Sequence, residues 1–176
     1  MPETQFFGHI GIIQSYSSTI HLSIFTQKFM LDLKASMQEI ARQMNAKFQE
    51  VNADVYLLDV PFKMKDGSFR YQYVYGRVAR ERAKGKDCFY FSSRCGTLTD
   101  ATNRYGLLVE AQYGVYTMIT CVSDKTADGS PCETVIVQAS PVASFVQSLD
   151  ELYAIIWEVA EVADIVEEKF FGGDKN

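Results

Sequence analysis

The feature that most constrains the fold of this chain is a long amphipathic stretch near its C-terminus, Ser148 to Phe171. Its apolar residues recur every three or four positions, the period of one helix face: Leu152, Ile155, Ile156, Val159, Val162, Ala163, Val166 and Phe170. Ser148 and Glu151 match a capping box, and Gly172 stands where a left-handed cap commonly ends a helix. A helix with one apolar face must cover something, so we expect the rest of the chain to supply a sheet.

The opposite side of this helix is acidic, with these carboxylates along it: Asp150, Glu151, Glu158, Glu161, Asp164, Glu167 and Glu168. Basic residues gather instead between Lys63 and Arg94. Either both faces are simply solvated, or one of them binds a basic partner or the basic hairpin of a second copy. The net charge of −5 and the pI of about 5.1 disfavour nucleic acid as a general partner.

The first half of the chain begins ambiguously. Residues 1–20 are apolar without a clear period, and they fit an extended arm packed on the body or on a second subunit. From about Leu22 to Val51 apolar residues again recur at three- and four-residue steps, which predicts a long amphipathic helix that stops near Asn52.

The middle of the chain has the period of strands. We predict strands at 55–62, 69–75, 88–94, 113–122 and 134–139, with an Asp66-Gly67 hairpin turn after the first. The segment 80–87 is expected to be a polar link, and 97–111 a connector with a short helix. The order α-β-β-β-(α)-β-β-α predicts an α+β fold, with a five-stranded antiparallel sheet packed by N- and C-terminal helices. The 176 residues are expected to form one domain.

Little in the sequence points to catalysis or to a metal. Cys88, Cys95, Cys121 and Cys132 contain no C-x-x-C pair, and the two histidines, His9 and His21, lie in the least interpretable segment. Phosphate-binding and nucleophile motifs are also missing, so we expect no enzyme activity and no cofactor or metal. The alternative is a small ligand-binding protein or thiol-dependent enzyme with a pocket near Cys88, Cys95 or Cys121.

The N-terminus lacks the charged start and apolar core of a signal peptide, and no stretch reaches the length of a membrane-spanning helix. We therefore expect a cytoplasmic protein with reduced thiols.

Tyr71, Tyr73 and Tyr75 occupy alternate positions of one expected strand and share one face of it. The preferred interpretation places them in the core, under a helix, with their hydroxyls at the edge. If that face is bare instead, it is a platform for binding a partner.

Several local patterns resemble those of YbjN-like proteins, which have the type III secretion chaperone-like fold. They are spread over residues 22–174: Arg70-x-Gln72-x-Val74, Ser92-Ser93-x-x-Gly96, Leu107-Leu108, and Val159-Ala160, Ala163-Asp164, Glu167 and Asp174 in the last segment. The resemblance implies a small acidic protein, a homodimer, that binds other polypeptides and has no catalytic residues.

The expected function is therefore protein binding, as a chaperone-like or regulatory adaptor. A client would contact exposed strand edges and the region of the second predicted strand, 69–75. The candidate partner-binding residues there are Arg70, Tyr71, Gln72, Tyr73, Tyr75 and Arg77.

Overall fold

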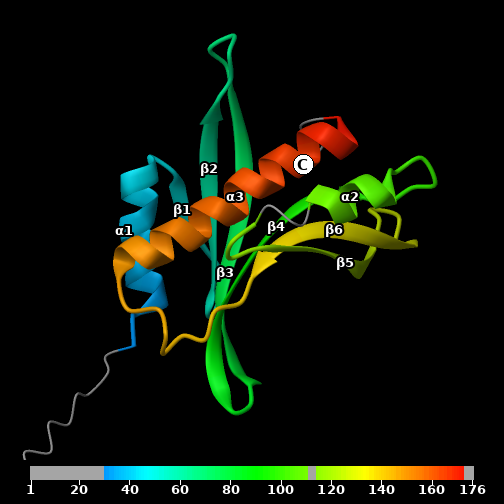
Figure 1. The fold of residues 1–176 in the computed structure, drawn as a ribbon. Helices are drawn as coiled ribbons and strands as arrows, with labels where there is room; N and C mark the ends of the chain where they lie inside the picture. The colour runs from blue at the N-terminus through cyan, green and yellow to red at the C-terminus, as the bar shows by residue number, and fades with distance from the viewer. Residues whose placement is uncertain (1–29, 111–113, 173–176) are drawn as a thin grey trace, which may run out of the picture.

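The structure, a computed structural model, describes residues 30–110 and 114–172 (Figure 1). Among these residues, three helices accompany one antiparallel sheet of six strands, in the spatial order β1-β2-β3-β4-β6-β5. The elements are α1 (Leu33–Met44), β1 (Lys47–Asn52), β2 (Val55–Lys63), β3 (Phe69–Ala83), β4 (Lys86–Thr97), α2 (Arg104–Glu110), β5 (Met118–Lys125), β6 (Pro131–Ala139) and α3 (Leu149–Phe171). The predicted α+β class is confirmed, with one strand more than expected.

The C-terminal helix α3 begins and ends where its sequence indicates. Ser148 Oγ accepts a hydrogen bond from the Glu151 amide at 3.1 Å, and Gly172 ends the helix with a φ of 80°. Most of the apolar stripe is buried, whereas Val162 and Phe170 are half-buried. The helix crosses the sheet diagonally (Figure 1), so one amphipathic segment covers strands that are far apart in the sequence.

The expected long helix at 22–51 is wrong in its second part. Helix α1 starts after the cap residue Asp32 and ends at Asn45, which has a left-handed φ of 55°. Lys47–Asn52 then turns back as the edge strand β1, the sixth strand of the sheet. Phe48 fits both periods, and in the strand it stacks on Tyr56 with 5.8 Å between the ring centroids. The predicted arm at 1–20 and the start of the predicted helix lie outside the described residues.

The expected polar link at 80–87 is also wrong. Strand β3 runs on to Ala83 and β4 starts at Lys86, so the two strands form a long hairpin that extends beyond the rest of the sheet (Figure 1). A bulge interrupts their pairing between Ala79 and Ala83, and Glu81 within it has a φ of 52°. The turn at Asp66-Gly67 and the short connector helix are confirmed, whereas the fourth predicted strand starts later, at Met118.

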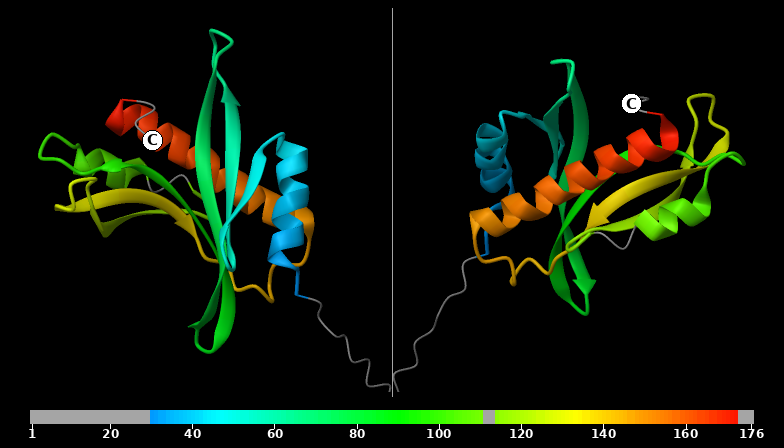
Figure 2. Two further views of the ribbon diagram at one scale, coloured as in Figure 1. Left: turned by 180° about the vertical axis from the view of Figure 1, so that it is seen from behind. Right: turned by 45° about the horizontal axis from the view of Figure 1, so that its top comes forward.

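One face of the sheet is covered by helices. Helix α3 packs on β3, β4 and β6, and α1 packs on β1 and β2 beside it. Gly76 on β3 permits this close approach, because a Cβ atom there would lie 2.5 Å from Met37 Sδ of α1. Seen from behind, the strands lie in front of α3 (Figure 2, left), so the opposite face of the sheet is turned away from this helix.

Candidate functional site

From Phe69 to Gly76, strand β3 alternates its side chains between the two faces of the sheet. Arg70, Gln72 and Val74 are buried on the helix-covered face. Tyr71, Tyr73 and Tyr75 lie on the other face and are 42%, 37% and 38% exposed. The preferred interpretation, which placed the tyrosines under a helix, is therefore wrong. The alternation shows that the two sets oppose each other, but it does not show which set faces the helix.

Arg70 faces α3 because that helix presents carboxylates to it. Its Nε and Nη2 donate to the two carboxylate oxygens of Asp164, both at 2.5 Å, and Nη2 also donates to Glu168 at 3.2 Å. The hydrogen bonds to Asp164 raise the pKa of Arg70. The arginine side chain is only 9% exposed. It therefore holds α3 on the sheet and does not form part of the partner-binding surface expected from the sequence. A basic residue of the hairpin thus meets the acidic helix within one chain.

Gln72 also belongs to the packing of α3. Its side-chain amide donates to the buried Glu167 carboxylate at 2.6 Å and accepts from Ser93 Oγ at 3.1 Å. All three side chains are at most 1% exposed. Gln72 is therefore a second expected contact residue that does not reach the surface. These buried hydrogen bonds fix the position of α3 on β3 and β4.

The exposed aromatic residues of β3 lie in one row with the neighbouring strands. Tyr71, Tyr73 and Tyr75 are opposite Pro61, Asp59 and Leu57 of β2, and residues paired in this way share a face. Phe69, 53% exposed, starts the row and Arg77 ends it. We name this surface the tyrosine face, and its residues are Leu57, Asp59, Pro61, Phe69, Tyr71, Tyr73, Tyr75, Arg77 and Tyr90. None of the helices that the structure describes covers it.

Two features of this face were not recognised in the sequence. Asp59 has a buried carboxylate oxygen, Oδ1, without a hydrogen-bond partner among the described residues. The signal was present, since Asp59 is the one charged residue between Val55 and Phe62. Arg77 lies with its guanidinium carbon 5.1 Å from the ring centroid of Tyr90 on β4, a pairing that depends on the register of two strands.

The cysteines do not gather at one place. Cys88 and Cys95 are buried, and burial raises the pKa of Cys95, with the Glu167 carboxylate acting in the same direction. Cys121 instead lines a hollow of about 330 Å³ between α2 and β5, with Leu98, Arg104, Leu107, Leu108, Ile119, Thr120 and Glu133. His9 and His21 lie outside the described residues. In the part that is described, no cluster of three metal-ligating side chains occurs.

Cys121 is expected to react slowly with thiol reagents. Burial and the nearby Glu133 raise the pKa of its thiol, against the opposite effect of Arg104, so the reactive thiolate forms only at higher pH than usual. In a Cys132→Ser background, Ellman's reagent should modify Cys121 more slowly than it modifies glutathione at neutral pH. The rate for Cys121 should continue to increase with pH above the usual thiol pKa. A reaction faster than that of glutathione at neutral pH would support the thiol-dependent alternative.

No protein-family model matches the chain, and no curated protein matches it. The resemblance to YbjN-like proteins stays a prediction from the sequence. Among residues 30–110 and 114–172, no helix has the length and apolar character needed to cross a membrane.

Proposed function

We propose that this protein binds another polypeptide through the tyrosine face and acts as a non-enzymatic, chaperone-like or regulatory adaptor in the cytoplasm. The observation that carries the proposal is the row of Phe69, Tyr71, Tyr73 and Tyr75 on a sheet face that none of the described helices covers. Tyrosine is enriched at protein interfaces, because its ring buries a large apolar area and its hydroxyl still forms hydrogen bonds.

Asp59 supports the same surface. A buried carboxylate oxygen without a donor is costly, by about 1–3 kcal/mol, and Asp59 Oδ1 has no donor among the described residues. It lies opposite Tyr73, inside the aromatic row. A carboxylate turns easily about its last bond, so this oxygen can rotate to the surface and accept a hydrogen bond from a backbone N–H or a basic side chain of a bound polypeptide, which would remove the cost.

Site-specific photo-cross-linking tests the proposal. A benzophenone amino acid replaces Tyr73 in one version of the full chain and, as a control, Tyr153 of α3 in another, which is half-buried beside Trp157. After irradiation in extract of the native host, a discrete cross-linked protein is expected at position 73 and not at 153. Added Tyr71→Ser and Tyr75→Ser substitutions should reduce the cross-link. Equal cross-linking at both positions, or none at 73, would contradict the proposal.

We also propose that the protein forms a homodimer, and the edge strand β5 supports this. Among the described strands, β5 pairs only with β6, and its residues Met118–Ser123 carry no charge, whereas the other edge, β1, carries Lys47 and Glu50. Natural sheets protect open edges with charges. Exposed apolar residues also gather here: Tyr105, Leu108, Val115, Tyr116, Met118 and Val122. A second copy would continue the sheet by antiparallel pairing of β5 with β5.

The dimer is tested by light scattering after gel filtration. The wild-type protein should have twice the chain mass of 19.9 kDa, and Leu108→Lys with Val122→Lys should reduce it to a monomer, because charges at an apolar interface lose hydration. The matched control is Val51→Lys with Ile165→Lys, two exposed apolar residues elsewhere. A wild-type monomer, or a dimer that survives the first pair of substitutions, would contradict this assembly.

The hollow beside Cys121 favours one competing function, a small-ligand or thiol-dependent protein. It is mostly apolar, and Arg104 and Glu133 supply charge at its border. The raised pKa of Cys121 argues against a nucleophilic role for this thiol.

A further inference from the structure

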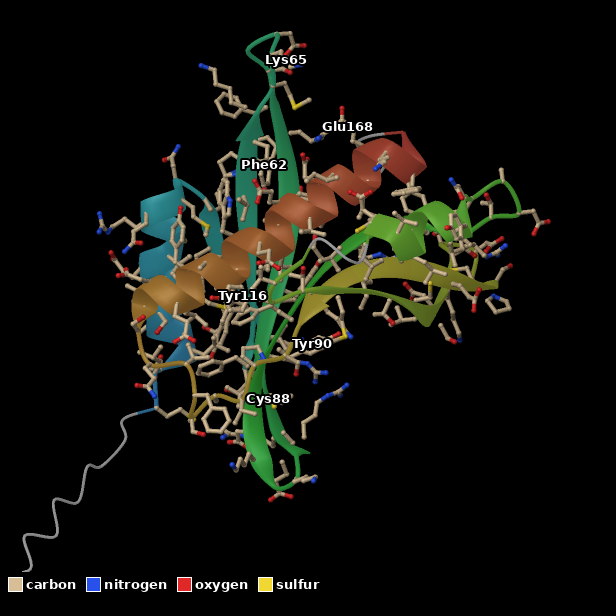
Figure 3. All side chains as sticks on the ribbon, viewed as in Figure 1. Phe62, Lys65, Cys88, Tyr90, Tyr116 and Glu168 are labelled. Carbon is tan, nitrogen blue, oxygen red and sulfur yellow. The ribbon has the colours of Figure 1, made fainter. Side chains whose placement is uncertain are left out.

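The tyrosine face ends in a hollow beside the β3–β4 hairpin. It has a volume of about 260 Å³, and it is lined by Val55, Tyr75, Gly76, Arg77, Tyr90 and Ser92. Tyr75 and Tyr90 supply aromatic walls from adjacent strands, and Figure 3 shows Tyr90 near this end of the hairpin. The hollow is therefore continuous with the aromatic row, and its lining includes a basic side chain, Arg77.

Two arginines share the ring of Tyr90. The guanidinium carbons of Arg77 and Arg82 lie 5.1 and 5.8 Å from its centroid. Arg82 follows the bulge at Glu81, and a bulge changes which way the next side chain points. An aromatic ring attracts a cation over its face, but it does not neutralise the charge of two guanidinium groups.

The nearby carboxylate does not pair with these arginines. Asp87 accepts the backbone N–H of Glu81 at 3.0 Å and a hydrogen bond from Arg80 at 2.6 Å, and both hydrogen bonds lower its pKa. In the described part of the chain, Arg77 and Arg82 have no carboxylate within ion-pair distance, whereas four arginines do: Arg42, Arg70, Arg80 and Arg94. The hollow thus has aromatic walls and one unneutralised guanidinium group in its lining, that of Arg77, and a second, that of Arg82, lies on the ring of Tyr90.

The charge around the hollow is also locally reversed. The segment from Arg77 to Asp87 contains five basic and two acidic residues in a chain with a net charge of −5. The acidic helix α3 packs on the opposite face of the sheet. An anion is therefore attracted to this end of the tyrosine face, whereas a long polyanion such as RNA is repelled by the protein as a whole.

From this arrangement we infer that the tyrosine face selects acidic peptide segments, with an Asp or Glu carboxylate bound by Arg77 and Arg82 and neighbouring apolar residues packed on Tyr73 and Tyr75. The inference rests on the proposed function and specifies the partner. Guanidinium groups suit it because they bind carboxylates through paired hydrogen bonds and stack on aromatic rings at the same time.

The test is a selection of random 12-residue peptides displayed on phage, made with the full-length protein at low salt. The most enriched peptide is then synthesised with a fluorescent label, and its affinity is measured by anisotropy. We compare wild type with Arg77→Gln/Arg82→Gln and with a control, Lys65→Gln/Lys125→Gln, which removes the same charge. Lys65 lies at the far end of β3 from Tyr90 (Figure 3), and Lys125 is an exposed residue at the end of the edge strand β5. Tyr73→Ser tests whether binding depends on the aromatic residues of the tyrosine face.

We expect enrichment of Asp and Glu, an affinity at least about tenfold weaker in Arg77→Gln/Arg82→Gln, and a change below about twofold in the lysine control. If the selected peptides lack acidic residues, and if their affinity depends on Tyr73 but not on the arginines, this inference is overturned and the proposed function stays intact. If the affinity of the selected peptides depends neither on Tyr73 nor on the arginines, the result contradicts both this inference and the proposed function. A labelled uridine 12-mer is measured in the same way. If it binds more tightly than the selected peptide, and if Arg77→Gln/Arg82→Gln abolishes that binding, the hollow is a nucleic-acid site instead.

Discussion

Replacing Arg70 by methionine is expected to lower the free energy of unfolding by about 3 kcal/mol, because removal of one partner from a buried ion pair leaves the other charge without compensation. Asp164 is the residue affected: its side chain is 13% exposed, and it accepts two hydrogen bonds from the guanidinium. Methionine keeps most of the length of the side chain, so lost packing contributes little.

Urea unfolding followed by the fluorescence of Trp157 measures this loss, since Trp157 lies on α3 and packs near Phe62 of β2. Arg77→Met is the matched control, because Arg77 is an exposed arginine of the same strand. It should change stability by less than about 0.5 kcal/mol. In the Asp164→Asn background, Arg70→Met should cost clearly less, as expected for coupled residues. A loss as small as that of Arg77→Met would show that the ion pair does not hold α3 on the sheet.

Replacing Gln72 by leucine is expected to lower the free energy of unfolding by about 2–3 kcal/mol, the range for a lost hydrogen bond to a buried charged group. The substitution removes the 2.6 Å donor to Glu167 and the acceptor of Ser93 Oγ. Leucine fills a similar volume, so the effect reports on hydrogen bonding more than on a cavity.

Ser93→Ala provides the graded comparison for Gln72→Leu. It removes only the neutral 3.1 Å hydrogen bond to Gln72 and should cost about 1 kcal/mol. Both variants are measured by the same urea titration. Equal losses for the two variants would mean that the hydrogen bond between Gln72 and Glu167 contributes little to stability.

Stability and binding should be separable in this protein, because β3 assigns them to opposite faces. Arg70 and Gln72 hold α3, whereas Tyr71, Tyr73, Tyr75 and Arg77 are turned away from it. Substitutions of the first group should affect binding only through unfolding. Substitutions of the second group should leave the urea midpoint nearly unchanged, so their binding defects can be interpreted directly.

The sequence alone determined the parts of the fold that depend on local chemistry. The S-x-x-E cap, the apolar stripe and Gly172 predicted α3, and Asp66-Gly67 predicted a hairpin between strands of period two. Local signals failed where one residue satisfied two periods. Phe48 fits both a helix and a strand, and the left-handed turn at Asn45, which decides between them, is compatible with asparagine without requiring it.

Only the tertiary structure decided which face of β3 is free. The alternation of Arg70, Gln72 and the tyrosines is the same whichever face meets the helix, and hydrophobicity alone favours burial of the aromatic residues. The carboxylates of Asp164 and Glu167 on the sheet-facing side of α3 reversed that choice, because they pair with Arg70 and Gln72 across more than 90 residues of sequence. Pairing over such a separation depends on how the helix is rotated on the sheet, and local periodicity carries no information about that rotation.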